Sequence, residues 1–312
     1  MFTSLAMNSR SRVVEGNTWL AAVGTDLEAK PTALQDYGLT PEVVETEDQV
    51  GRAMLAELEQ LACAKEGDLT IALLGGRGAQ AMHRLLGERA RSGDNDGLIS
   101  RLNIFTQDAL APMRPENSFS FVRDFERLLG ADFFLRVKSF TTVRTDSPDL
   151  EAESISYVRK LEALGGLDIF FLGLGPELGG ASHLAYIKPY SGATAVDVAG
   201  IIPVSATILE HHISKFKAGG SPVSEADEAE CRNATHILTL GPAAILGAKR
   251  IVQSVVDADT APAKCESYRR VIDSPISDQA EKQARQLDAN PGLWIRLHPN
   301  VRSLVLPNVL ES

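Results

Sequence analysis

The sequence predicts an α/β fold with a mostly parallel sheet covered by helices on both faces. Short apolar runs typical of buried parallel strands recur along the chain, and the clearest occupies residues 167–172. Longer segments with apolar residues at helical spacing lie between these runs. Strands that alternate with helices form a parallel sheet, so we expect any ligand site at the carboxyl ends of the strands.

The expected elements follow one another along the chain. They are helix 46–65, strand 68–74, helix 79–88, strand 102–105, helix 118–129, helix 150–164, strand 167–172, helix 207–217, strand 235–240, strand 250–256, helix 264–272 and strand 301–306. No internal repeat or low-complexity linker divides them. We therefore expect an N-terminal extension over residues 1–45, which begins as a loose or partner-dependent arm, and a single domain over residues 46–312.

Composition limits the class of protein. The chain has 312 residues and a formal net charge of −10, which argues against binding to nucleic acid or to an anionic membrane surface. Its three cysteines are widely spaced, which favours a reduced cytoplasmic location and fits neither a disulfide framework nor a zinc site. The six histidines also lack metal-ligand spacing. We expect no metal and no cofactor.

A glycine-rich turn directly follows the strand at residues 68–74. It consists of Gly75, Gly76, Arg77 and Gly78, and a helix begins at Ala79. A strand, a glycine turn and a helix N-terminus together can bind phosphate through free backbone N–H groups and the helix dipole. The turn is neither a Walker A loop nor a dinucleotide-binding fingerprint. A phosphate site and a plain tight connection both remain open for this turn.

Side chains suited to acid–base chemistry follow two other strands. Asp108 comes just after the strand at residues 102–105, and Glu177 and His183 lie in a glycine-rich loop after the strand at residues 167–172. Loops at the carboxyl ends of parallel strands meet at one edge of the sheet. We therefore expect these three side chains to converge on one cleft, where they can transfer protons.

Five segments share their order with those of a known family. They read LLGGRGAQ (73–80), FTQDALAPMRPENSFSF (105–121), GLGPELGGASHLAY (173–186), THILTLGPAAILGAKRIV (235–252) and WIRLHPNVRSLVLP (294–307). They resemble the phosphate loop and the later motifs of the glucosamine-6-phosphate deaminase and 6-phosphogluconolactonase family. The resemblance implies a modified doubly wound, Rossmann-like fold and a role in carbohydrate metabolism.

The resemblance also implies roles for individual residues. The amides of Gly75 to Ala79 would hold a substrate phosphate, with positive charge from Arg77 and Lys264. Asp108 would move a proton between C1 and C2 of an open-chain hexose phosphate. His183, oriented by Glu177, would open the sugar ring. The implied partner is a small-molecule sugar phosphate, and a homo-oligomer is left open.

The sequence departs from the deaminase pattern at several positions. Glu177 replaces an aspartate, His183 is displaced by about four residues, and Lys188 replaces a glutamate. Lys188 is either a solvated lysine or a contact to an acidic substituent of the substrate. Thr207 aligns with a phosphate-binding arginine of the deaminases, which leaves that charge without a counterpart.

Three functions stay open at this point. An isomerase or deaminase is favoured by Asp108 and by the aromatic Tyr186, where lactonases read H-T-A-S after the glycines. A lactonase is favoured by the glycine turn, and it needs only a histidine that activates water on an ester. The partial loss of the catalytic motif fits a third function, a sugar-phosphate-binding or regulatory protein without turnover.

Overall fold

The computed structural model describes residues 11–311 except residues 28, 94 and 96. Its centre is a seven-stranded sheet in which all neighbouring strands are parallel. In spatial order the strands are β3 (Pro41–Val43), β14 (Val301–Val305), β13 (Arg250–Val255), β8 (Ile169–Leu172), β4 (Leu69–Leu73), β5 (Leu102–Thr106) and β7 (Ser139–Thr141).

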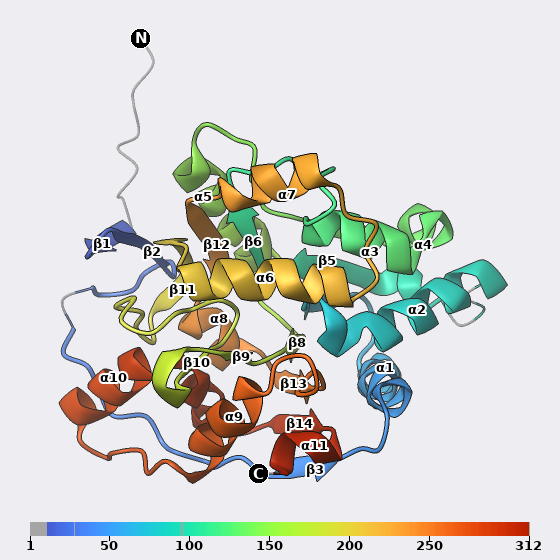
Figure 1. The fold of residues 1–312 in the computed structure, drawn as a ribbon. Coiled ribbons are helices and arrows are strands. Elements are labelled where there is room, and N and C mark those ends of the chain that lie inside the picture. Colours follow the sequence, from blue (N-terminus) through green and yellow to red (C-terminus); the bar gives the residue numbers. More distant parts are fainter. Residues whose placement is uncertain (1–10, 28, 94, 96, 312) are drawn as a thin grey trace.

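The central strands form where the sequence has continuous apolar runs. Every residue of β4, β5 and β8 is buried, which is the pattern expected of parallel strands covered on both faces. Helices surround the sheet (Figure 1). The predicted α/β class with a mostly parallel sheet is therefore confirmed.

A second sheet has five strands, all antiparallel to their neighbours. In spatial order these are β1 (Ser11–Val14), β2 (Asn17–Ala21), β11 (Asp197–Pro203), β12 (His236–Leu240) and β6 (Asp108–Ala111). The sequence predicted β12 as a strand but did not predict this sheet. Local apolar patterns indicate a strand without identifying its partner.

The N-terminal region is more closely integrated than the sequence predicted. Strand β2 pairs with β11 of the second sheet, and β3 pairs with β14 of the parallel sheet. The expectation of a loose arm is wrong for residues 11–17, while residues 1–10 lie outside the described part of the chain. Trp19 on β2 is fully buried and its indole N–H donates to Ser191 O at 2.8 Å, which anchors this region.

The remaining elements are helices and one short ribbon. The ribbon pairs β9 (Gly175–Pro176) with β10 (Ser182–His183). The helices are α1 (Glu47–Ala64), α2 (Arg77–Ser92), α3 (Phe121–Leu129), α4 (Ala131–Arg136), α5 (Leu150–Ala163), α6 (Ala206–Ala218), α7 (Glu225–Arg232), α8 (Pro242–Gly247), α9 (Ala263–Asp273), α10 (Ala280–Ala289) and α11 (Pro307–Leu310), with 3-10 turns η1 (Ile99–Arg101), η2 (Leu178–Gly180) and η3 (Pro291–Leu297).

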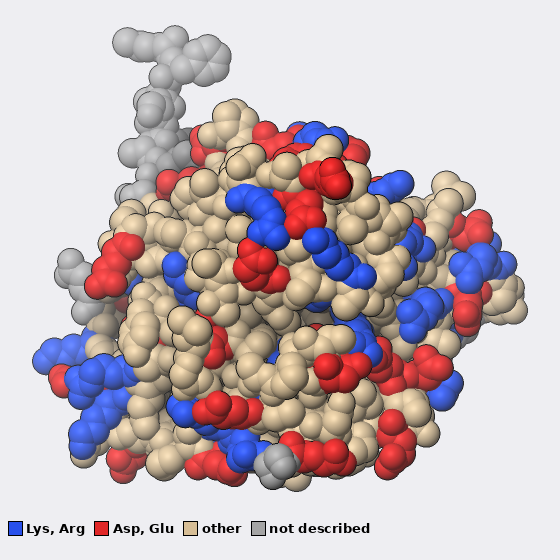
Figure 2. All heavy atoms as spheres, in the orientation of Figure 1, with Lys and Arg blue, Asp and Glu red and all other residues tan. Residues whose placement is uncertain are grey.

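Two surface properties bear on function. Acidic and basic side chains are interspersed over the face in Figure 2, so that face has no large patch of a single sign. Among the described helices, none combines the length and the apolar character needed to cross a bilayer.

Candidate active site

A cleft opens at the carboxyl ends of four neighbouring parallel strands. Residues that follow β13, β8, β4 and β5 line it, together with side chains from α6 and α9. Its lining includes the glycine turn, Asp108 and His183. The structure thus brings the glycine turn, Asp108 and His183 into one cleft, at the edge of the sheet where open α/β folds bind ligands. Glu177 does not line this cleft itself and lines a neighbouring cavity instead.

The glycine turn presents free backbone N–H groups to this cleft. Gly76 has a φ of 82°, a conformation that favours glycine, and it precedes the first residue of α2. The amides of residues 75–78 have no hydrogen-bond acceptor within the described chain. The Ala79 amide, in contrast, donates to Gly76 O at 3.3 Å. The amides of residues 75–78 are therefore available to an incoming acceptor, whereas the Ala79 amide is already engaged.

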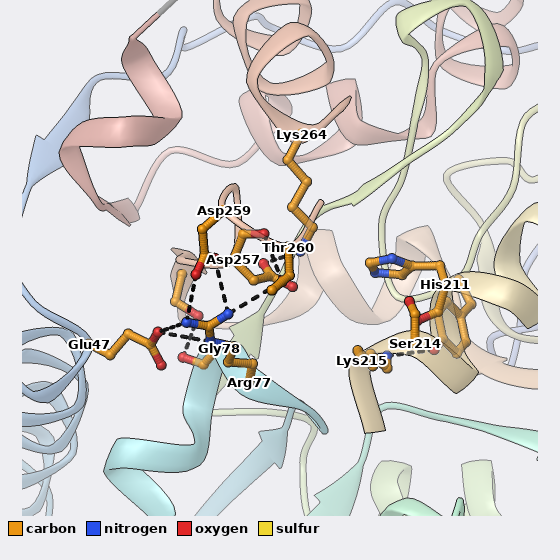
Figure 3. A network of polar contacts seen from close by, with 12 residues as sticks. Glu47, Arg77, Gly78, His211, Ser214, Lys215, Asp257, Asp259, Thr260 and Lys264 are labelled. Atoms are coloured by element: carbon orange, nitrogen blue, oxygen red, sulfur yellow. Dashed lines mark hydrogen bonds and ion pairs between the residues drawn. The ribbon is translucent and has the colours of Figure 1, made fainter. Parts of the chain in front are cut away.

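Two of the expected cations are already engaged by carboxylates, as Figure 3 shows. Arg77 donates from Nε to Glu47 at 2.8 Å and from Nη1 to Asp259 at 3.0 Å. The Lys264 ammonium is bonded to Asp257, which is itself buried. Arg77 and Lys264 both line the cleft, but a bound anion would share them with these carboxylates.

Asp108 lies at the start of β6, with only 4% of its surface exposed. Its Oδ1 atom has no hydrogen-bond partner within the described structure. Burial raises the pKa of Asp108 to about 7, although the positive charge of Lys215 opposes this shift. A carboxyl group that is half ionised near neutral pH is well suited to act as a general base.

The raised pKa of Asp108 makes a prediction about stability. Because its pKa is higher in the folded than in the unfolded protein, the folded state holds the proton more tightly. The contribution of Asp108 to the free energy of unfolding must then fall as pH rises from about 4 to 7. Asp108→Asn removes the cost of burying an ionised carboxylate. The free energy of unfolding of the variant should therefore exceed that of wild type by at least about 1 kcal/mol at pH 8 and by little at pH 4. Urea denaturation at both pH values measures the difference, and an equal change at both would contradict it.

The displaced histidine is returned to the cleft by the β9–β10 ribbon. His183 pairs with Gly175 across this ribbon, and the Glu177 amide closes the loop by donating to Ala181 O at 2.8 Å. The inserted residues therefore form a hairpin loop. A Cβ atom on Gly175 would lie 1.7 Å from His183 Nε2, so glycine is required for the ring to occupy this position.

Glu177 and His183 form a buried pair. The Nδ1 atom of His183 lies 2.9 Å from Glu177 Oε1, which orients the ring and leaves Nε2 on the side of Gly175 and the cleft. Burial lowers the pKa of His183, with Glu177 opposing this shift and Lys215 and Lys264 adding to it. The imidazole is accordingly neutral at pH 7 and can accept a proton at Nε2.

Lys188 does not line this cleft. Its ammonium donates to Pro203 O at 2.7 Å, and the side chain lines a neighbouring cavity on the other side of Glu177. Burial lowers its pKa. We therefore leave Lys188 out of the substrate site, because this geometry offers no support for the contact expected there.

Sequence reasoning missed Lys215, which supplies a positive charge inside the cleft. It lies on α6, and its ammonium is 4.6 Å and 4.7 Å from the ring centroids of Phe121 and Tyr186. A Cβ atom on Gly76 would lie 3.7 Å from Lys215 Nζ, so the charge is beside the glycine turn. The resemblance aligns Thr207, two turns earlier on the same helix, with the phosphate-binding arginine of the deaminases, and a threonine supplies no positive charge.

A chain of hydrogen bonds fixes the position of Lys215. The Nε2 atom of His212 lies 2.7 Å from Phe119 O, which requires the proton on Nε2 and makes Nδ1 an acceptor. Tyr186 O–H then donates to that Nδ1 atom at 2.9 Å, and the Tyr186 oxygen accepts from Lys215. The adjacent histidines and the lysine on the predicted helix 207–217 were the only available sequence signal.

Parts of the sequence are similar to curated proteins. No protein-family model matches the sequence. A glucosamine-6-phosphate deaminase of Porphyromonas gingivalis is 31% identical over 105 residues, which are 32% of this chain and 37% of that protein. A glucosamine-6-phosphate deaminase of Bacillus pumilus is 25% identical over 145 residues, covering 46% and 53% of the two chains. The chain thus matches only part of the length of these curated relatives.

Solved structures match over most of the chain. A monomeric glucosamine-6-phosphate deaminase has a TM-score of 0.64 at 18% identity, covering 87% of this chain and 98% of its own. The 6-phosphogluconolactonase of Trypanosoma brucei has a TM-score of 0.61 at 17% identity, covering 89% and 99%. The fold is the one that these deaminases and lactonases share. Part of the sequence thus resembles glucosamine-6-phosphate deaminases, and the fold resembles that of solved glucosamine-6-phosphate deaminase and 6-phosphogluconolactonase structures.

The described residues contain no cluster of three histidine, cysteine or carboxylate side chains arranged to hold an ion.

Proposed function

We propose that this protein is an aldose–ketose isomerase or deaminase that acts on a hexose 6-phosphate, with an amino sugar phosphate as the first candidate substrate. One observation carries the proposal. A buried carboxyl group with an unpartnered oxygen, Asp108, lines the same cleft as the free amides of residues 75–78. A phosphate held at the amides and a base beyond it suit proton transfer on an open-chain sugar.

The proposed reaction assigns one step to each group. His183, oriented by Glu177, accepts the proton of the C1 hydroxyl at Nε2 and delivers it to the ring oxygen as the bond between C1 and that oxygen breaks, so that the sugar opens. The Asp108 carboxylate then removes the proton from C2 and returns it to C1, which converts the aldose to the ketose level. With an amine at C2, the resulting iminium is hydrolysed by water and ammonia leaves. Lys215, Arg77 and Lys264 supply positive charge around the phosphate.

A lactonase is the second candidate, and the His183–Glu177 pair is the observation that favours it. A neutral imidazole with a free Nε2 atom can take a proton from water. The hydroxide then adds to the lactone carbonyl, and the ring ester bond breaks to give the acid. This reaction has no step for Asp108, whereas the isomerase or deaminase reaction requires it.

One set of assays separates these candidates. The purified protein is given glucosamine 6-phosphate, with release of ammonia and ketose phosphate measured, and separately 6-phosphogluconolactone, with acid release measured. The first activity supports the proposal and the second alone supports the lactonase. Binding of both compounds without turnover would show that the protein binds or senses sugar phosphates and would contradict both enzyme proposals.

The position of Lys215 makes a prediction about phosphate binding. Lys215→Met should weaken binding of a hexose 6-phosphate by about 10-fold or more, because a charge-assisted contact to the phosphate is lost. Lys217→Met is the matched control. Lys217 lies on the same helix but does not line the cleft, and its ammonium is 2.7 Å from Glu228 Oε2. Calorimetric titration measures both, and equal affinities in the two variants would contradict this role.

A further inference from the structure

The cleft contains a second imidazole that the proposed reaction does not use. His211 lies on α6 one turn before Lys215, and it lines the cleft with His183. The centroids of the two imidazole rings are 6.0 Å apart, in an edge-to-face arrangement. Neither ring nitrogen of His211 has a hydrogen-bond partner in the described structure, and Figure 3 shows the ring directed into the space that Lys264 also faces.

The groups around His211 keep it neutral while the cleft is without a ligand. Its pKa lies well below the ordinary value, first because of burial and then because of the positive charges of Lys264 and Lys215. His183 and His212 lower it further. The two lysines come from α9 and α6 and line the cleft together with His211, where a phosphate at the glycine turn would approach them.

An anion in the cleft would oppose the effects that keep His211 neutral. Negative charge beside Lys215 and Lys264 offsets their repulsion of a proton on His211 and favours the imidazolium. The protonated ring then has an additional N–H donor and no longer lacks a partner, because the anion itself accepts the hydrogen bond.

We propose that His211 takes up a proton from solvent when a phosphate-bearing ligand binds, and that the resulting imidazolium donates a hydrogen bond to that ligand. The inference rests on the proposed function only in requiring that the cleft binds an anion. It assigns His211 as a ligand-binding residue whose proton uptake makes binding tighter as pH falls from 8 towards 6. Asp108, His183 and Lys215 face the same space and can also change protonation, so the test must isolate the share due to His211.

The test uses sulfate, a dianion that does not itself titrate between pH 6 and 8, with glucose 6-phosphate as a second ligand. Histidine ring resonances of the wild-type protein are followed by NMR during sulfate addition at pH 6.5. The resonance missing from the His211→Gln spectrum identifies His211. We expect it to move towards the imidazolium position, while that of His236, which bonds to Thr235 outside the cleft, stays in place.

Calorimetry in buffers of different ionisation enthalpy counts the protons taken up with each ligand. His211→Gln should take up roughly half a proton fewer than wild type, and His236→Gln should match wild type. His211→Asn serves as a second variant if the first does not fold. Binding with an unmoved His211 resonance and with equal proton uptake in the variants would overturn the inference and leave the proposed function intact. Failure of wild type to bind either anion would overturn both.

Discussion

Asp108→Asn is expected to lower kcat by about two or more orders of magnitude while leaving the KM for the sugar phosphate nearly unchanged. Asparagine keeps the shape of the side chain but cannot accept the proton from C2. The substitution leaves the glycine turn and Lys215 unchanged, so binding through the proposed phosphate site should persist. The loss should therefore appear in the chemical step alone.

The pH profile provides a second test of the same role. The base must be ionised to act, so kcat/KM should rise with pH through about 7, the pKa to which burial raises Asp108 in the free protein. Asp146→Asn is a suitable control, because Asp146 is an exposed carboxylate paired with Arg144 and should leave kcat unaltered. A loss below about tenfold in Asp108→Asn would contradict the assignment of Asp108 as the base.

His183→Ala is expected to reduce activity strongly with a cyclic sugar phosphate and much less with an open-chain analogue. The ring-opening step needs the imidazole, and an open-chain substrate bypasses it. The loss with the cyclic substrate should be about 100-fold or more, as expected for removal of a general acid–base group. His236→Ala, outside the cleft, should leave both rates unchanged.

The two variants together separate the enzyme classes. In a lactonase, His183→Ala would be severe because the imidazole activates water, and Asp108→Asn would be mild. In the isomerase or deaminase proposed here, Asp108→Asn is severe with both the cyclic and the open-chain substrate. Measuring initial rates of both variants on one cyclic and one open-chain sugar phosphate therefore distinguishes the proposed function from its main alternative.

Several parts of the site could be predicted from sequence because they depend on local pattern. The glycine turn and Asp108 each follow an apolar strand directly, and the carboxyl ends of parallel strands meet at one edge of the sheet. This rule was sufficient to place them in one cleft with His183. Lys188 was suggested as a substrate contact by the family resemblance and not by this rule; it lies outside the cleft lining, and its ammonium donates to Pro203 O.

The histidine shows that an insertion can change the spacing along the chain while the side chain still lines the cleft. Alignment placed His183 about four residues too late in the chain. The extra residues form the loop between β9 and β10, and ribbon pairing brings His183 back opposite Gly175 and beside Glu177. Sequence spacing measures distance along the chain, whereas proton transfer depends on distance in space.

Sequence alone determined the α/β class, the glycine turn, and Asp108, Glu177 and His183 as the candidate acid–base groups. These features follow from residue type and from short-range periodicity. Tertiary structure decided which cations are free to meet an anion, since Arg77 and Lys264 are engaged by carboxylates while Lys215 faces the turn from α6. It also decided that the pKa of Asp108 is near 7, because burial by distant segments governs that shift and no local motif records it.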